Sequence, residues 1–247
     1  MSDRAKIVLV TGGSRGIGAS TAMTLAAQGW DVAISYRARA DVAEDVVDAC
    51  LQQGRRAIAV QGDVASEADI VRIFEAVDRE LGPVSGLVNN AGVVTPGSKV
   101  ADYTAERLQQ LFAINITGAF LAAREAVRRM STSRGGNGGV IVNVSSRAAA
   151  LGGAGEYVDY AASKAAIDAM TIGLAREVAE EGIRVVGVSP GLISTDIHAP
   201  GRLERLGSTP PLGRPGDPQE VANAIGWLIS GEASYVTGAT LDISGGR

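Results

Sequence analysis

Short apolar runs alternate along the chain with longer stretches in which apolar residues recur with the period of a helix. The short runs are rich in Val and Ile, which is typical of strands buried on both faces of a parallel sheet. They predict seven strands, at residues 6–11, 31–36, 55–61, 85–90, 139–145, 183–189 and 239–244. The stretches between them predict helices near residues 16–29, 40–54, 66–82, 104–130, 157–181 and 218–230. This order indicates the α/β class: a doubly wound, seven-stranded, mostly parallel sheet with helices on both faces.

Two segments depart from the alternation. Residues 131–139 are rich in Gly and Ser and are interpreted as a flexible linker. Residues 191–217 form a longer irregular segment, and such a segment inside a compact domain is usually a lid or a binding loop. We therefore expect a single domain, residues 1–247, in which residues 191–217 are the substrate loop.

The composition narrows the classes of protein to which the chain can belong. With 247 residues, 46% of them hydrophobic, the chain can bury the core of one large domain. No apolar run approaches the roughly 18 residues of a spanning helix, and the residues after Met1 leave no room for a signal peptide, so we expect no membrane partner. The single Cys50 agrees with a reducing compartment, and a cytoplasmic location is expected. A net charge of −4 and an aromatic content of 4% argue against nucleic acid as a partner.

A glycine-rich stretch, VTGGSRGIGAS at residues 10–20, stands between the first predicted strand and the first predicted helix. Free backbone N–H groups at a helix start can bind a pyrophosphate. Gly12 would allow a sharp turn, Gly16 would leave room for the diphosphate, and Gly18 would let the helix pack closely on the sheet. Glycines are also common in ordinary strand-to-helix turns, so this pattern alone does not distinguish a dinucleotide-binding turn from an ordinary one.

The end of the second predicted strand discriminates between dinucleotides. An acidic residue there would bind the adenosine 2′-hydroxyl of NAD, but the position holds Tyr36 and Arg37, and Asp31 lies at the opposite end of the strand. Arg37 and Arg15 could hold a 2′-phosphate with their guanidinium groups. The sequence therefore favours NADP (NADPH) over NAD as the cofactor.

Tyr160 and Lys164 are candidates for proton transfer. They are four residues apart on a predicted helix and share a face, whereas Tyr157 lies one turn too far from Lys164. A nearby ammonium would lower the pKa of the Tyr160 phenol, which could then exchange a proton with an alcohol or ketone oxygen.

Two neighbouring hydroxyls, Ser145 and Ser146, end a predicted buried strand at the sheet edge where ligands bind in doubly wound folds. Either could hold a carbonyl oxygen beside the phenol. Ser–His–Asp hydrolysis is disfavoured because the only histidine, His198, lies in the irregular segment and no G-x-S-x-G motif is present. Cys50 and His198 supply no metal-ligand spacing, so no metal is expected.

Together these motifs resemble the short-chain dehydrogenase/reductase family. They are TGGSRGIG (11–18), GDV (62–64), NNAG (89–92), the asparagine of FAINITG (112–118), NVSS (143–146), YAASK (160–164), SPGLISTD (189–196) and YVTGATLDISGG (235–246). The match covers nearly the whole chain in order and is similar to the branch with 3-oxoacyl-carrier-protein reductases and glucose dehydrogenases. The resemblance implies a Rossmann fold, hydride transfer between nicotinamide and a small-molecule ketone or secondary alcohol, and a homotetramer.

The resemblance also implies a catalytic tetrad. Tyr160 would be the acid/base, Ser146 would hold the carbonyl, Lys164 would bind the nicotinamide ribose, and Asn115 would hold a water that relays protons. Ser146 is preferred to Ser145 because it is nearer to Tyr160, although its interval to Tyr160 is one residue longer than the commonest family spacing.

Cofactor contacts are implied in the same way. Adenine contacts are implied for Asp63 and Val64, ribose-side contacts for Asn89 and Ala91, and contacts to the nicotinamide amide for Ile193 and Thr195. The full set of expected cofactor-binding residues is Gly12, Ser14, Arg15, Gly16, Ile17, Gly18, Arg37, Asp63, Val64, Asn89, Ala91, Gly92, Tyr160, Lys164, Pro190, Gly191, Ile193 and Thr195.

The leading hypothesis is thus an NADP-dependent oxidoreductase. The alternative is a non-catalytic NADP-binding sensor or scaffold, which would have no need of an aligned phenol and ammonium. An epimerase or dehydratase like the longer relatives would need more substrate-binding chain than residues 191–217. Arg202 and Arg205 could attract an acidic substrate or a carrier protein, but solvated surface positions are expected for both, and the sequence specifies no substrate.

Overall fold

The computed structural model describes residues 6–198 and 200–247. Its central feature is a seven-stranded sheet in the order β3-β2-β1-β4-β5-β6-β7, and every neighbouring pair is parallel. The predicted α/β class is confirmed, and the sheet is parallel throughout rather than mostly parallel. The strands are β1 (Ile7–Val10), β2 (Asp31–Tyr36), β3 (Ala57–Gln61), β4 (Gly86–Asn89), β5 (Gly139–Val144), β6 (Ile183–Pro190) and β7 (Thr240–Ile243).

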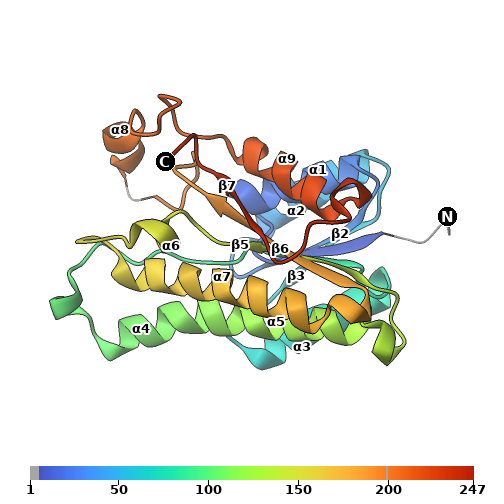
Figure 1. The fold of residues 1–247 in the computed structure, drawn as a ribbon. Helices are drawn as coiled ribbons and strands as arrows, with labels where there is room; N and C mark the ends of the chain where they lie inside the picture. The colour runs from blue at the N-terminus through green and yellow to red at the C-terminus, as the bar shows by residue number, and fades with distance from the viewer. Residues whose placement is uncertain (1–5, 199) are drawn as a thin grey trace.

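Helices cover both faces of the sheet, as Figure 1 shows. One layer holds α1 (Gly16–Ala27), α2 (Ala40–Gln52) and α9 (Pro218–Ile229). The other holds α3 (Glu67–Glu80), α4 (Ala105–Phe112), α5 (Ala119–Met130) and α7 (Val158–Glu177).

Alternate residues of each strand face opposite layers. In β1, Ile7 and Leu9 pack into the core under α3, α5 and α7, whereas Val8 and Val10 pack into the core under α1, α2 and α9. Both faces are therefore apolar, which is why these strands appear in the sequence as unbroken apolar runs.

The helix predicted over residues 104–130 is interrupted. A π-helical turn, Ala113–Gly118, separates α4 from α5. The apolar pattern continues through this turn, so the pattern alone predicted a single helix. Short π-helical insertions occur frequently at functional sites, and Asn115 lies in this one.

The parallel register brings the carboxyl ends of the central strands to one edge. Val88 of β4 is level with Val10 of β1, and Val142 of β5 is level with Val88 and with Val186 of β6. The segments that follow β1, β4, β5 and β6 therefore meet at the left-hand edge in Figure 1, where α6 (Ala148–Leu151) and α8 (Arg202–Leu206) also lie.

Residues 191–217 run over this edge and are less irregular than expected. They contain the short helix α8, and an isolated bridge joins Ile193 to Gly216. Backbone hydrogen bonds from Ser194 to Gly216 and from Gly216 to Leu192 connect the two ends of the segment. The segment is thus fixed at its base, with α8 at its far end.

No described helix combines the length and the apolar character needed to cross a membrane. The lone Cys50 is buried in α2, and burial raises the pKa of its thiol to about 11.

We predict that Leu9→Ala strongly destabilises the fold. Leu9 is fully buried in β1, an inner strand of the sheet, and truncating a buried leucine usually costs about 3 to 5 kcal/mol because it removes apolar contacts and leaves a cavity. Leu51→Ala, at a side chain that is 47% exposed on α2, is the matched control and should cost less than about 0.5 kcal/mol. Urea unfolding of both variants measures the difference, and equal losses would contradict the core assignment.

Candidate active site

The glycine turn between β1 and α1 adopts a conformation that suits glycine. Gly12 has φ of 63°, and a Cβ there would lie 3.0 Å from the Cα of Ala91. A Cβ on Gly18 would lie 2.5 Å from the Gly12 carbonyl oxygen, so Gly18 permits close packing on the turn itself rather than on the sheet. Gly16 also has positive φ, and a Cβ there would lie 3.1 Å from Thr195 Cγ2, on the segment that covers the sheet edge.

Two polar residues hold this turn against β4. Asn90 Nδ2 donates to the carbonyl oxygens of Thr11 and Gly12, at 2.9 and 3.1 Å. Thr11 Oγ1 accepts hydrogen bonds from the backbone N–H groups of Asn90 and Ala91. The sequence analysis did not single out Thr11 or Asn90, although both lie inside motifs that it quoted.

The start of α1 is free to bind an anion. Its N-cap residue, Arg15, makes no side-chain capping bond, and the first turn holds no acidic residue. The first N–H groups of the helix therefore have no intrahelical acceptor. The residues present fit the pyrophosphate of a dinucleotide.

Arg15 is the N-cap residue of this helix and Arg37 directly follows β2, and their side chains are 60% and 65% exposed. Arg15 lies 3.9 Å from Asp196, and Arg37 lies 3.8 Å from Asp63. These are loose contacts, so both guanidinium groups keep free donors. Asp63, an expected adenine contact, is thus brought beside Arg37.

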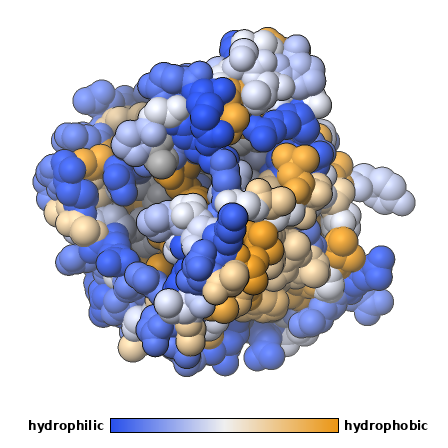
Figure 2. All heavy atoms as spheres, turned by 90° about the vertical axis from the view of Figure 1, so that its left-hand side faces the viewer, coloured by the Kyte–Doolittle hydropathy of each residue, from blue (hydrophilic) through white to orange (hydrophobic). Residues whose placement is uncertain are grey.

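A cavity of about 560 Å³ opens at the carboxyl ends of β4, β5 and β6. It contains several of the expected cofactor residues and both serines of interest. Those that line it are Ile17, Gly92, Ser145, Ser146, Tyr160, Lys164, Pro190, Gly191, Ile193 and Thr195. In the view of Figure 2, which faces this edge, hydrophilic side chains cover much of the surface and hydrophobic ones gather to the right.

Other expected contacts lie beside the cavity or below it. Asn89 is buried, and its Nδ2 donates to the Ala119 carbonyl and to Asn143 Oδ1, so its side chain is not available to a ligand. Val64 is buried as well. Its neighbour in the chain, Asp63, is partly exposed at the end of β3.

Lys164 is buried below Tyr160. Its Nζ donates to the Val144 carbonyl at 2.8 Å, at the end of β5, and lies 5.8 Å from the centroid of the Tyr160 ring. Burial lowers the pKa of Lys164 to about 8, while the charge of Asp168, one turn along α7, acts in the opposite direction. The amine is therefore still mostly protonated at pH 7.

The pKa of the phenol is raised in this structure, whereas a lowered pKa was expected. Burial raises the pKa of Tyr160 to about 12, a hydrogen bond with Ser146 opposes the rise, and Tyr157 adds to it. Desolvation of the phenolate is the dominant cause of the raised pKa. The phenol therefore carries its proton at neutral pH.

The two serines differ in orientation. Ser145 is buried, and its Oγ donates to the Lys164 carbonyl at 3.1 Å, which joins β5 to α7. Ser146 lines the cavity, lowers the pKa of Tyr160 and accepts from the Ala148 N–H. Of the two hydroxyls, Ser146 is the one beside the phenol.

Asn115 faces the same site from the π-helical turn. It is buried, its Oδ1 accepts from the Val93 N–H at 2.9 Å, and its Nδ2 donates to the Val93 carbonyl and to Ser163 Oγ. These bonds hold the segment after β4 against α7. A Cβ on Gly92 would lie 3.4 Å from both Asn115 Oδ1 and Lys164 Nζ, so the three groups are close neighbours.

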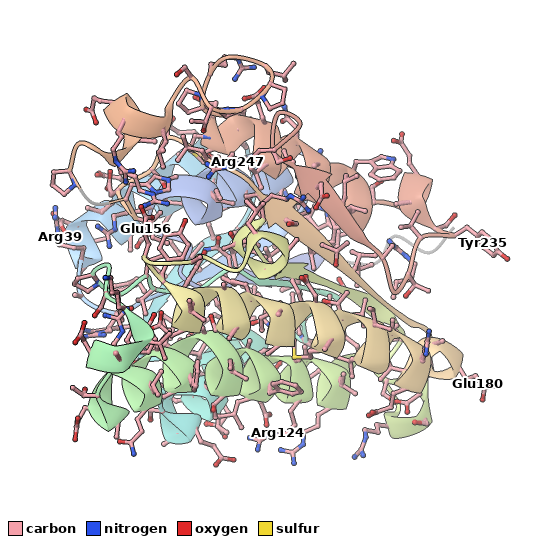
Figure 3. All side chains as sticks on the ribbon, turned by 60° about the vertical axis from the view of Figure 1, so that its left-hand side comes forward. Arg39, Arg124, Glu156, Glu180, Tyr235 and Arg247 are labelled. Atoms are coloured by element: carbon pink, nitrogen blue, oxygen red, sulfur yellow. The ribbon has the colours of Figure 1, made fainter. Side chains whose placement is uncertain are left out.

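Arg202 is not the solvated surface residue that was expected, whereas Arg205 is, since 59% of its side chain is exposed. Arg202 is only 15% exposed, and its guanidinium donates to Glu156 and to the Tyr157 hydroxyl, while Arg205 pairs with the same glutamate at 3.1 Å. Both arginines line the cavity. Figure 3 shows Glu156 on this side of the molecule, beneath α8.

Among residues 6–198 and 200–247, no group of three or more His, Cys, Asp or Glu side chains could hold a metal ion. His198 Nε2 instead lies 2.8 Å from the Ile193 carbonyl oxygen, and burial lowers the pKa of its imidazole.

Comparisons with known proteins agree with this geometry. A family model described as enoyl-(acyl carrier protein) reductase matches residues 12–247. An uncharacterized oxidoreductase of Escherichia coli K12, YgfF, is 50% identical over 98% of this chain and 99% of its own. A 3-oxoacyl-[acyl-carrier-protein] reductase of Synechocystis sp. is 35% identical over 98% of this chain and 96% of its own. The chain belongs to the short-chain dehydrogenase/reductase family.

A solved structure supports this assignment. A short-chain dehydrogenase of Burkholderia cenocepacia J2315, crystallised in complex with NADP, superposes with a TM-score of 0.91 at 36% identity, covering 98% of this chain and 97% of its own. The protein is therefore an oxidoreductase of this family with an NAD(P)-binding Rossmann-type fold.

This family member has a buried carboxylate next to Tyr160 that the sequence analysis missed. Asp159 has no exposed side-chain surface and accepts from Arg107 Nε at 2.7 Å, the Tyr103 hydroxyl at 3.1 Å and Thr95 Oγ1 at 3.2 Å. It also accepts from the backbone N–H of Tyr160 at 2.9 Å. We call these residues, without Tyr160, the Asp159 cluster.

The Asp159 cluster joins three elements at the cavity. Arg107 belongs to α4, Asp159 to the first turn of α7, and Thr95 to the segment after β4 that lines the cavity. Arg107 also donates to the carbonyl of Pro96, another lining residue. The cluster therefore fixes one wall of the cavity relative to Tyr160.

We predict that Asp159→Asn destabilises the protein by about 3 kcal/mol at pH 7, because it leaves the Arg107 charge without its buried partner. Arg107 holds the pKa of Asp159 below its usual value. The stabilisation is therefore complete above pH ~4 and is lost as the pH falls through the folded-state pKa. The deficit of the variant should thus shrink below pH 4.

Urea unfolding between pH 3 and pH 7 measures this dependence. Asp41→Asn, which breaks an exposed pair with Arg39, is the control and should change stability far less. A deficit in Asp159→Asn that stays constant down to pH 3 would contradict the assigned ion pair.

Proposed function

We propose that the protein is an NADP-dependent oxidoreductase that transfers hydride between nicotinamide and the carbon of a ketone or secondary alcohol. The observation that carries this proposal is the position of the Tyr160 phenol, which lines the cavity beside Ser146 and directly above the buried Lys164 ammonium. A binding protein without catalysis would gain nothing from burying an ammonium beneath a phenol.

The cofactor proposal rests on the glycine turn and on the two exposed arginines. The uncapped start of α1 suits the pyrophosphate, and Arg15 and Arg37 offer guanidinium groups to a 2′-phosphate. Bound NADPH supplies the hydride that the carbonyl carbon receives.

The protein's own residues orient and protonate the carbonyl oxygen of the substrate. In reduction, Tyr160 donates its phenolic proton to that oxygen as the carbon accepts hydride, and the product is an alcohol. Ser146 orients the oxygen, Lys164 compensates the phenolate charge, and Asn115 fixes the turn beside them. The pKa of about 12 keeps the phenol protonated at neutral pH, as a proton donor must be.

We propose a homotetramer formed by a single domain that uses residues 191–217 as its substrate loop, in the cytoplasm. Support for self-association comes from large apolar side chains exposed on two separate regions. Phe120 on α5 and Ile172 on α7 form one region, and Trp227 on α9 and Leu241 on β7 belong to the other. Two regions of this kind are what a tetramer with two kinds of interface requires.

We predict that Tyr160→Phe lowers kcat by about 10³-fold or more, because the proton donor is removed, while NADPH affinity stays within about threefold. Tyr157→Phe is the matched control. The centroids of the Tyr157 and Tyr160 rings lie 5.8 Å apart, but Tyr157 has no assigned role in proton transfer. NADPH absorbance on a panel of ketones and alcohols measures turnover, and calorimetry measures binding.

Retained turnover in Tyr160→Phe would overturn the mechanism. If the wild-type protein bound NADPH tightly and turned over no member of a broad panel, the sensor or scaffold alternative would stand instead.

We also predict that the wild-type protein has a higher kcat/KM with NADPH than with NADH. In Arg15→Gln/Arg37→Gln this preference should fall by about ten- to a hundredfold, because charge-assisted hydrogen bonds to the 2′-phosphate are lost, whereas kcat/KM for NADH should hardly change. Arg39→Gln, an exposed arginine that pairs with Asp41, is the control. A wild-type preference for NADH would refute the role of both arginines.

A further inference from the structure

The outer part of the cavity is rich in guanidinium groups. Arg202 and Arg205 of α8 and Arg247 line it, whereas Glu156 is the only residue with a side-chain carboxylate that lines it among the described residues. Figure 3 labels Glu156 and Arg247, which lie on the same side of the molecule. The guanidinium groups of these three arginines thus outnumber the side-chain carboxylates at this part of the cavity, although the whole chain carries a net charge of −4.

The hydrogen bonds of these groups leave donors for a ligand. Arg202 and Arg205 share the single carboxylate of Glu156. In the part of the chain that the structure describes, the Arg247 guanidinium contacts Thr209 Oγ1 at 3.5 Å and no carboxylate. Arg147, which also lines the cavity, is by contrast satisfied by Asp242 and by the Arg247 carbonyl.

Tyr157 lies between this cationic region and Tyr160, because its ring contacts the Tyr160 ring and its hydroxyl accepts from Arg202. The cavity also has an apolar part. Val94, Leu151 and Ile197 line it. A ligand that reaches from Ser146 and Tyr160 to the arginines therefore needs a carbonyl or hydroxyl at one end, a hydrocarbon part and an anionic group at the other end.

We propose that Arg202, Arg205 and Arg247 form an anion subsite, and that the substrate is a small oxo or hydroxy compound bearing a carboxylate or phosphate. Guanidinium groups bind both of these anions with paired hydrogen bonds. Arg202 is mostly shielded from solvent, so its attraction to an anion is screened less than at an open surface.

Glu156 acts in this subsite as a competitor of the substrate's anionic group. It occupies Arg202 and Arg205 when no substrate is bound, so the substrate's anion must compete with it. Because one carboxylate replaces another, the exchange costs little, and a neutral substrate would gain nothing from it.

This inference rests on the proposed function, and its test uses substrate pairs that differ only in charge. The carboxylate arm compares 3-oxobutanoate with its methyl ester, and the phosphate arm compares dihydroxyacetone phosphate with dihydroxyacetone. In at least one arm, the anion should have a kcat/KM about tenfold or more above its neutral partner, with the difference mainly in KM.

Variants then test whether the preference for the anionic substrate depends on Arg202 and Arg205. Arg202→Gln/Arg205→Gln should lower the ratio of anion to neutral substrate by about tenfold or more, whereas Arg79→Gln, an exposed arginine on α3, should leave it within about twofold. Glu156→Gln should raise the ratio, because it removes the competing carboxylate. Equal kcat/KM for both members of each pair, or a ratio that the double variant does not change, would overturn the subsite.

Calorimetry separates a failed subsite from a failed function. With NADP present, the favoured anion should bind the wild type about tenfold more tightly than its neutral partner, and the double variant should lose this difference. If binding follows this pattern without turnover, the subsite stands and the proposed reaction does not. If neither anion binds more tightly than its neutral partner, the subsite is wrong even where turnover is observed.

Discussion

The hydrogen bond from Lys164 Nζ to the Val144 carbonyl is the contact on which the site depends. It places an ammonium inside the protein, where a charge without a partner would be very costly. Val144 ends β5, a central strand held on both sides by β4 and β6, so the carbonyl that receives the ammonium is itself fixed. Ser145 adds a second bond, to the Lys164 backbone. Together they fix the position of α7 on the sheet edge, and with it the position of Tyr160.

Burial acts on the two titrating groups of this site in opposite directions. It raises the pKa of Tyr160 and lowers the pKa of Lys164, because each group loses solvation in its charged form. An anion at the phenol and a cation at the lysine would stabilise each other, so a phenolate formed in the proposed reaction would be compensated by an ammonium already in place. The Asp159 cluster contains a separate ion pair between Arg107 of α4 and Asp159 of α7, and Asp159 accepts from the Tyr160 backbone N–H and not from its phenol. The cluster therefore holds the backbone of Tyr160 in position, while Lys164 supplies the positive charge near its phenol.

The sequence predicted most of the fold and only part of the site, for identifiable reasons. Strands such as β1 and β5 are local apolar runs, and Tyr160 and Lys164 are linked by helical spacing, so both were visible in the sequence. Asp159 was not, since its partners Arg107 and Tyr103 lie more than fifty residues away and nothing local distinguishes it from a solvated carboxylate. The π-helical turn at Asn115 was missed because an inserted residue leaves the apolar pattern intact. Arg202 was misjudged because its burial depends on Glu156, in a different segment.

Several cationic groups of the molecule lie at the sheet edge where the carboxyl ends of the strands meet. Groups that can donate hydrogen bonds to an anion lie at two places along it, the start of α1 with Arg15 and Arg37, and the outer cavity beneath α8. The acidic residues that make the chain negative overall are spread over the rest of the molecule, for example on α2 and α3. A negative molecule with a positive cleft repels anions in general but attracts them at that cleft, and low-dielectric walls focus the field there. A dinucleotide with a 2′-phosphate and an acidic substrate would both be drawn to this edge, and Glu156 moderates only the second. The edge that the parallel register creates therefore also determines where the molecule can hold anions.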